Sequence, residues 1–461
     1  MPPDENAQSA AIFGMSNRRQ SWFKGRVPVS RQPLHNVLWL ASERTLRIGL
    51  TGVVLALVAR HLQPAGFGEL AFASSFTGLF TPLAFCGLDA WLVSELVRRP
   101  GQGAALLGTA ALLRLAAGAI SAVVCVALAF ALPGLRSGAW FILPLSLGLL
   151  WQSAEVTDVW FQRHLQSRRT ALARFTAVVL GAAVKVWLVW RGAPAVWFAW
   201  AVLGDVVFFE FGLLLAYARM PDKPGRWRFD PALARTLLRQ GAPLALAGLL
   251  LALQARLDQF IVKAALPDTA TGDYFAAVRI VELPLFLTGA IGLSIFPAFA
   301  ASLERGEHAF AEHAQRLFDL LNGFAWLAAL GITVFGPWAV PRLLGPAYAG
   351  AVGPLLVLAW GLVPWAGSFA RQQCILAGRP TWLQMVAALV GIGAQGAFAA
   401  ALVPRFGGPG AALAAIIANV ISGWLTSFVL PGLQASARWQ GRAFLIPFAP
   451  RRWRAAAALL R

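Results

Sequence analysis

The sequence predicts an all-α membrane protein of about twelve transmembrane helices, on three observations. Of its 461 residues, 58% are hydrophobic and only 13% are charged, a balance that cannot cover the surface of a soluble domain. The apolar residues form repeated blocks of about 20 or more, each long enough to cross a hydrocarbon core about 30 Å thick. Most Lys and Arg residues lie in the short connections between those blocks, as membrane insertion requires.

Turn residues and charges set the limits of the individual apolar blocks. The first half of the chain has blocks at residues 37–60, 68–94, 104–132, 139–162, 170–190 and 195–218. After a polar stretch, the second half has blocks at residues 241–264, 273–302, 316–343, 350–376, 381–403 and 409–434. We therefore expect two lobes of six helices each, and because six is even, both lobes would enter the membrane from the same side.

The positions of the basic residues predict the orientation of the chain. With the N-terminus in the cytoplasm, most of the 39 Lys and Arg residues fall on the cytoplasmic side. The periplasmic segments then hold only Arg60, Arg136, Arg191, Lys263, Arg342 and Arg405. We therefore expect both termini to be cytoplasmic, and insertion to be directed by the first helix because no cleavable signal peptide is apparent.

The formal net charge of +19 would suggest a nucleic-acid ligand in a soluble protein. Here the charge lies between apolar blocks, so we expect it to contact anionic lipid headgroups and expect no nucleic acid partner. The cysteines fall inside apolar blocks without CxxC spacing, so we expect neither a disulfide framework nor a metal site. They are Cys86, Cys125 and Cys374.

The longest internal connection, residues 219–240, divides the chain into domains. Asp230 is suited to cap a helix and Pro231 to occupy its first position. We expect a short amphipathic helix here, lying on the cytoplasmic surface between the two lobes. The predicted domains are an N-terminal tail at 1–36, an N-lobe at 37–218, this linker at 219–240, a C-lobe at 241–434 and a basic C-terminal tail at 435–461.

A weak internal repeat relates the two halves at a separation of about 203 residues. Residues 58–64, followed by Gly68, Glu69 and Ala71, recur as residues 262–267, followed by Gly272, Asp273 and Ala276. Both copies fall between the first and second helices of their half. The repeat predicts that the lobes are pseudo-symmetric about an axis along the membrane normal.

Several motifs keep a fixed order and spacing between about residue 36 and residue 434. They are Arg60-His61-Leu62-Gln63-Pro64 with Phe67-Gly68, Gly87-Leu88-Asp89-Ala90, Trp160-Phe161-Gln162 with Arg168, Arg256-Leu257-Asp258, Gly272 to Arg279, Phe296-Pro297, and Pro404-Arg405-Phe406-Gly407 with Gly410-Ala411-Ala412.

Together these motifs resemble those of polysaccharide flippases of the Wzx type. The superfamily of those proteins also contains multidrug-extrusion (MATE) antiporters and peptidoglycan-precursor flippases. The resemblance implies a MATE-like fold in a bacterial inner membrane and alternating access by two six-helix lobes. It also implies a cargo of undecaprenyl-pyrophosphate-linked oligosaccharide, moved to the periplasmic leaflet for the synthesis of O-antigen, capsule or exopolysaccharide. The polysaccharide polymerase machinery would be a partner.

Basic residues inside the predicted helices are candidates for contact with the pyrophosphate, because charges in a bilayer usually face a wet cavity. Arg47 and Arg114 lie about 15 Å from the cytoplasmic helix ends, by the rise per residue. The full set is Arg47, Arg114, Lys185, Arg256 and Arg279. Arg44 and Arg174 lie closer to the surface and are interpreted as headgroup anchors. The structural alternative for this set is ion pairing, with Asp258 near Arg256 and Glu282 near Arg279.

Acidic residues inside the helices are candidates for binding a coupling ion, H⁺ or Na⁺. They are Asp205, Glu210, Asp258 and Glu282. Glu155 and Asp158 lie one turn apart, and form either a cation site or a polar stripe against a neighbouring helix.

A flippase is therefore the first functional hypothesis. A cation-coupled drug antiporter of the same superfamily ranks second, because only the charge of the cavity separates the two. A membrane glycosyltransferase or ligase ranks third, since every predicted periplasmic loop is short and only His61 lies on that side. No GxxxxGK[ST] loop or zinc-ligand spacing occurs. We thus expect a functional monomer that is not an enzyme and binds no cofactor or metal.

Overall fold

The computed structural model describes residues 34–164, 166–302, 306–378, 380 and 382–457. The predicted N-terminal tail therefore lies outside the described residues except for positions 34–36, as do the last four residues of the predicted C-terminal tail. Within the described residues, every regular element is a helix. The predicted all-α class is confirmed.

Nine helices in the described part of the chain are long and apolar enough to cross a membrane. Two of them contain a break and so hold two predicted blocks each. α2 (Leu34–Gly78) is interrupted at Gln63, where φ is 58°, and α14 (Trp382–Val420) at Gly407, also with φ of 58°. Together with α11 (Asp268–Ala301), which holds the eighth predicted block, they give twelve segments. The prediction of about twelve is therefore confirmed.

The two breaks form where the sequence places proline. Pro64 follows Gln63, and Gly407 lies between Pro404 and Pro409. Proline cannot donate a backbone hydrogen bond to the preceding turn, so the helix axis is free to change direction there. Gly407 takes its positive φ without steric cost because it has no side chain.

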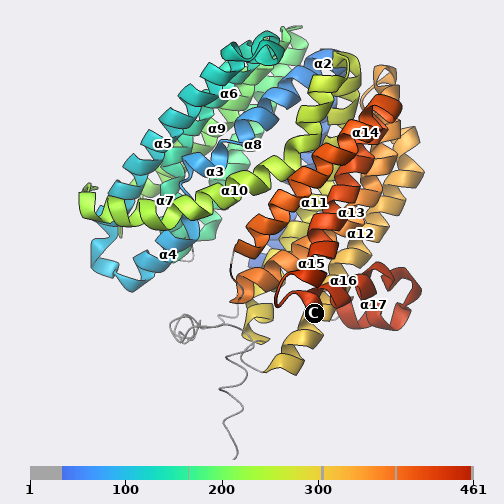
Figure 1. Cartoon of the computed structure of the whole chain (residues 1–461). Helices are drawn as coiled ribbons and strands as arrows, with labels where there is room; N and C mark the ends of the chain where they lie inside the picture. The colour runs from blue at the N-terminus through green and yellow to red at the C-terminus, as the bar shows by residue number, and fades with distance from the viewer. Residues whose placement is uncertain (1–33, 165, 303–305, 379, 381, 458–461) are drawn as a thin grey trace, which may run out of the picture. The chain divides into compact units, whose positions relative to one another are not determined.

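The chain divides into two compact units, of which the larger comprises residues 38–276 and 338–352. In this unit α8 (Ser167–Trp190) and α9 (Ala195–Ala218) pack side by side, and α6 (Ala139–Trp151) lies between α9 and α5 (Gly103–Ala131), as Figure 1 shows. Two shorter helices, α4 (Asp89–Arg98) and α7 (Val156–Arg163), pack at one end of them. Their buried Leu92, Leu96, Val156 and Phe161 join one apolar core.

The predicted linker helix is present as the start of a longer helix, α10 (Pro231–Ala265). The Asp230 carboxylate accepts hydrogen bonds from the backbone N–H groups of Ala232 and Leu233, so it caps the helix as the sequence predicts. The helix does not end before the next apolar block. It continues through Pro243, so the amphipathic segment and the following span form one element.

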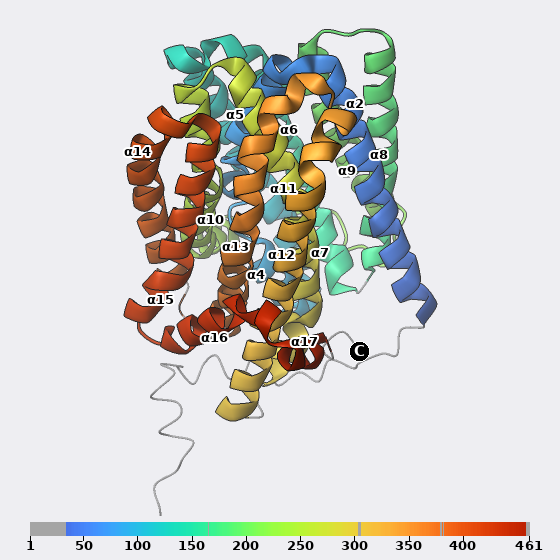
Figure 2. The same cartoon turned by 90° about the vertical axis from the view of Figure 1, so that its right-hand side faces the viewer.

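The smaller unit comprises residues 34–37 and the described residues of 277–337 and 353–457. Its long helices are α11 from residue 277, α12 (Glu307–Leu343) as far as residue 337, α13 (Val352–Gly378) and α14. A five-residue π-helix, Ile421–Leu425, and α15 (Thr426–Val429) extend α14. Figure 2 shows α16 (Gln434–Phe444) and α17 (Pro450–Ala457) lying toward the same end of this unit as α15.

The described part of the basic C-terminal tail is folded against this unit. The guanidinium of Arg452 donates from Nε to Oδ2 of Asp319 over 3.0 Å and pairs through Nη2 with Oδ1 of the same carboxylate. The ring of Trp453 lies directly over Gly323, where no side chain would fit. The tail is thus held to α12 by a bidentate ion pair and by packing.

Candidate functional site

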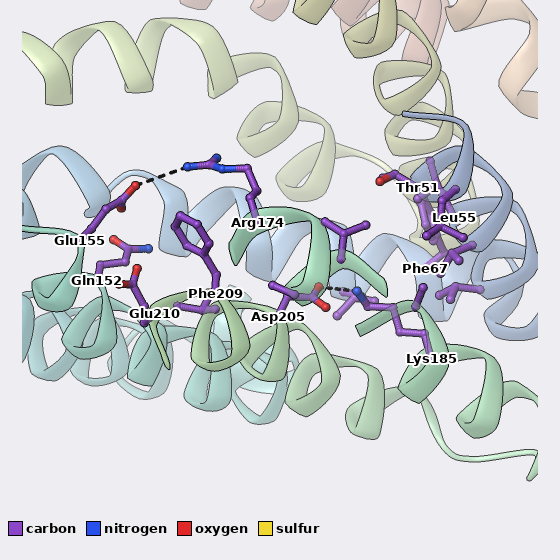
Figure 3. Close-up of a pocket in the computed structure, with 18 residues that line it drawn as sticks. Thr51, Leu55, Phe67, Gln152, Glu155, Arg174, Lys185, Asp205, Phe209 and Glu210 are labelled. Atoms are coloured by element: carbon purple, nitrogen blue, oxygen red, sulfur yellow. Dashed lines mark hydrogen bonds and ion pairs between the residues drawn. The ribbon is translucent and has the colours of Figure 1, made fainter. Parts of the chain in front are cut away.

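A pocket of about 450 Å³ lies inside the larger unit, between α2, α8, α9 and the short 3₁₀ turn Gln152–Glu155 (Figure 3). One side is apolar and includes Val54, Leu55 and Phe67 of α2. The polar side chains that line the pocket are Thr51, Gln152, Glu155, Arg174, Lys185, Asp205 and Glu210. Charged side chains inside a bundle of membrane-spanning helices are costly in free energy and usually serve a function. This pocket is therefore the candidate site.

Four of the five charged residues form two ion pairs across the helices. Lys185 of α8 pairs with Asp205 of α9, and Arg174 of α8 lies 3.7 Å from the carboxylate of Glu155 (Figure 3). The Arg174 guanidinium also lies 4.4 Å from the ring centroid of Phe209. Arg174 and Lys185 are eleven residues apart, about three helical turns, so they project from the same face of α8.

The fifth charged residue, Glu210, is the most buried acid of the pocket, with 1% of its surface exposed. Among the described residues it has no ion pair, and its Oε2 and the Oε1 of Gln152 have no hydrogen-bond partner. The pocket therefore holds three carboxyl groups against two bases. Glu210 makes no direct contact with a base, although the charges of Arg174 and Arg114 act on it from a distance. Binding a proton or a small cation would remove the remaining cost of burying its carboxylate.

Three of the predicted site residues, Lys185, Asp205 and Glu210, thus meet in this pocket. Arg47 lies half-buried on α2 but outside the lining. Arg114 also lies outside it. Its side chain is 1% exposed, donates from Nη2 to Asp89 over 2.5 Å, and lies 5.2 Å from the ring centroid of Phe85.

The other predicted residues lie elsewhere. Arg256 donates to the Ser75 hydroxyl over 3.2 Å, and Asp258 accepts a hydrogen bond of 2.5 Å from the Tyr274 hydroxyl. Neither lines the pocket.

Arg279 and Glu282 lie in the smaller unit and form an ion pair of 2.6 Å. The pairing that the sequence offered as the structural alternative is therefore present.

Sequence reasoning missed two residues that the structure makes prominent. Arg174 was interpreted as a headgroup anchor, but it lines the pocket. Its eleven-residue spacing from Lys185 was a usable signal. Arg371 of α13 is 2% exposed and donates from Nη1 to the Ser422 carbonyl in the π-helix over 2.8 Å. It lies close to the end of an apolar block, where a basic residue resembles an ordinary loop charge.

Solved structures with similar folds cover nearly the whole chain. An inward-facing multidrug resistance MATE family transporter of the MOP superfamily matches with a TM-score of 0.68 and 16% identity, over 87% of this chain and 96% of that one. The lipid II flippase MurJ, in an inward closed conformation, matches with a TM-score of 0.67 and 13% identity, over 89% and 92%.

A MOP superfamily transporter from Pyrococcus furiosus, described by the reverse polarity of its binding pocket, matches with a TM-score of 0.57 and 14% identity, over 88% and 94%. These likenesses show a MATE-like fold for a multi-pass membrane protein.

No curated protein sequence matches the chain significantly. The model of one protein family does match, over residues 57–353, which is more than half of the chain. The matched region includes α5, α8, α9 and every helix of the candidate pocket except the beginning of α2. The chain therefore belongs to the polysaccharide biosynthesis protein family, and its fold is similar to that of transporters of the MOP superfamily.

Proposed function

We propose that the protein flips an undecaprenyl-pyrophosphate-linked oligosaccharide from the cytoplasmic to the periplasmic leaflet of a bacterial inner membrane. Both termini would be cytoplasmic, and the two six-helix lobes would open alternately to the two sides. The observation that carries the proposal is the charged pocket between α2, α8 and α9. Membership of the polysaccharide biosynthesis family supports an oligosaccharide cargo, which polysaccharide polymerase machinery would then use.

The bases of the pocket suit the head group of this cargo. Lys185 and Arg174 are cations in a region of low dielectric, where contact with a pyrophosphate is stronger than in water. Sugar hydroxyls can donate to Glu155 and Asp205 and accept from Gln152. Of the five predicted pyrophosphate ligands we place Lys185 first, because it alone lines the pocket. Arg47, Arg256 and Arg279 rank below it, and we assign Arg114 a structural role.

Glu210 is the best candidate for the coupling ion, either H⁺ or Na⁺. It is buried and has no ion pair among the described residues, whereas Asp205 already pairs with Lys185. A cation that binds Glu210 would neutralise the acidic surplus of the pocket.

A second candidate function, cation-coupled drug antiport, is favoured by that same surplus. Three carboxyl groups against two bases, with Phe67 and Phe209 alongside, could bind an organic cation in competition with a proton. Of the five basic residues that the sequence predicts as pyrophosphate ligands, only Lys185 contributes to the charge of this pocket.

The first test measures flipping of a fluorescent lipid-linked oligosaccharide in proteoliposomes. We expect wild type to flip it, Lys185→Ala to reduce the rate by about tenfold or more, by loss of a charge-assisted contact, and Lys185→Arg to recover part of the rate. Arg316→Ala, which removes a base that is paired with Glu312 outside the pocket, is the matched control and should change the rate little. Absence of wild-type flipping, together with uptake of a cationic dye driven by a pH gradient, would favour the antiporter.

The second test examines Glu210→Gln, which keeps the shape of the side chain and removes its charge. We expect flipping to lose its dependence on an imposed H⁺ or Na⁺ gradient, while the folded protein remains at least as stable, because a buried carboxylate is replaced by a neutral amide. Glu312→Gln is the control, since Glu312 is exposed and paired on α12. Unchanged gradient dependence in Glu210→Gln would assign the coupling ion to another acid.

A further inference from the structure

A second hollow lies beside the charged pocket, on the outer side of α2 and α8. It is an open groove of about 570 Å³ in the larger unit. Its walls are apolar, with Val53 and Leu57 from α2 and Val179, Val186, Trp187 and Trp190 from α8. Several of these side chains are widely exposed, including Val53 at 60% and Trp190 at 79%. In a membrane-spanning bundle such a surface faces hydrocarbon.

The groove and the charged pocket share part of their walls. Leu50, Val54 and Ala182 line both. Lys185 follows Ala182 by less than one turn of α8 and is adjacent in sequence to Val186, which lines the groove. A ligand in the groove therefore lies next to the Lys185–Asp205 end of the pocket, and the three shared residues form the boundary between the apolar groove and the charged pocket.

We propose that this groove binds the isoprenoid chain of the lipid-linked cargo while its pyrophosphate lies at Lys185. The inference rests on the proposed function. A chain of hydrocarbon cannot enter a pocket lined by five charged side chains, because it would desolvate them without compensation. A cargo whose head occupies the pocket must therefore leave its chain outside, and the groove is the apolar surface that adjoins the pocket along α8. The volume of the groove is in the range of small-ligand sites.

The groove also gives a reason for the small size of the residues at its floor. Ala182 is buried and Ala183 is exposed, and larger side chains at these positions would fill the hollow between α2 and α8. Trp187 and Trp190 form the wall near the end of α8. Rings of this size present a broad apolar face to a branched chain at small entropic cost.

The direct test uses undecaprenyl diphosphate with a diazirine in its chain, in proteoliposomes of the wild-type protein. We expect photolabelling of the α2 segment 50–57 and the α8 segment 179–190, displaced at least tenfold by unlabelled undecaprenyl diphosphate. Phosphatidylglycerol with a diazirine in its acyl chain is the comparison, and unlabelled phosphatidylglycerol should not displace the polyprenyl label. Equal labelling by both probes, without selective displacement, would mean that ordinary lipid fills the groove and would overturn the inference.

A matched pair of variants adds a functional measurement. Ala183→Trp places a large ring in the groove, whereas Leu180→Trp adds a ring to an exposed position of the same helix that does not line it. We expect Ala183→Trp to lower both polyprenyl labelling and flipping by about tenfold, the loss of a contact worth about 1.4 kcal/mol, and Leu180→Trp to resemble wild type. If wild type flips its cargo and Ala183→Trp does so equally well, the groove inference fails, while the proposed function stands. If wild type does not flip, the proposed function fails, and selective labelling still decides whether the groove binds polyprenyl chains.

Discussion

Replacing Asp89 by alanine is expected to lower the free energy of unfolding by about 3 kcal/mol or more, the usual cost of leaving a buried charge without its partner. Arg114 is 1% exposed and pairs with Asp89 through Nη2, while its Nε and Nη1 have no hydrogen-bond partner among the described residues. Asp89→Ala would therefore leave a buried guanidinium beside the Phe85 ring with no ion pair among the described residues. Thermal or denaturant unfolding in detergent micelles would measure the change.

The reverse replacement should cost less, because the two partners differ in exposure. Asp89 has 58% of its side chain exposed, so water can solvate its carboxylate when Arg114→Met removes the cation. The double variant Asp89→Ala/Arg114→Met should regain much of the stability lost by Asp89→Ala. Glu312→Ala breaks an exposed pair with Arg316 and serves as the control, with an expected effect below about 1 kcal/mol.

This experiment also tests the role of Arg114 in transport. If Asp89→Ala is as stable as wild type, the assignment of Arg114 to a structural ion pair with Asp89 is wrong, and Arg114 returns to the set of candidate cargo ligands. If the predicted loss is seen, Arg114 and Asp89 hold the break between α3 (Thr81–Ala84) and α4 in place. That break contains Cys86 and Gly87, both with positive φ. Their conformation needs support from the surrounding structure.

The fold could be predicted from the sequence because each helix is marked by a local pattern of residues. Blocks of apolar residues gave the spans, and Pro64 and Pro409 gave the two breaks inside long helices. The Asp230 cap could be identified for the same reason, since its partners lie two and three residues away. What local sequence did not give was the continuity of α10 through Pro243. A proline in a membrane helix bends it without ending it when neighbouring groups satisfy the backbone.

The site could be predicted only in part, because burial depends on how helices are rotated against one another. Lys185, Asp205 and Glu210 were identifiable as charges inside apolar blocks, and they do line the pocket. Arg114 satisfied the same criterion, yet it faces Asp89. Depth along a helix is fixed by the rise per residue, but the direction of a side chain around the helix axis depends on tertiary packing. The position of Arg174 on the wall of the pocket could not be predicted for that reason.

Replacing Gly272 by alanine is expected to destabilise the protein by more than the 1 to 3 kcal/mol typical of an overpacked core, roughly 3 kcal/mol or above, or to prevent folding. Gly272 of α11 lies against the backbone of Pro64, and its new Cβ would overlap the Pro64 carbonyl group. From the other side, a Cβ on Gly68 would lie 2.9 Å from the Gly272 Cα atom. Rigid backbone cannot withdraw as a flexible side chain can. Unfolding in detergent, or the yield of folded protein, would measure the effect.

Gly289→Ala is the matched control, because Gly289 lies on the same helix and nothing approaches its Cβ position within 4 Å. That variant should be neutral or slightly stabilising, since alanine favours helix over glycine. Gly68 and Gly272 are the positions that the internal repeat of the sequence matches to each other. Their contact joins α2 to α11 through two small residues, as in close crossings of membrane helices. A Gly272→Ala protein as stable as wild type would show that α11 can move away from Pro64 at little cost, and that this crossing is a mobile contact.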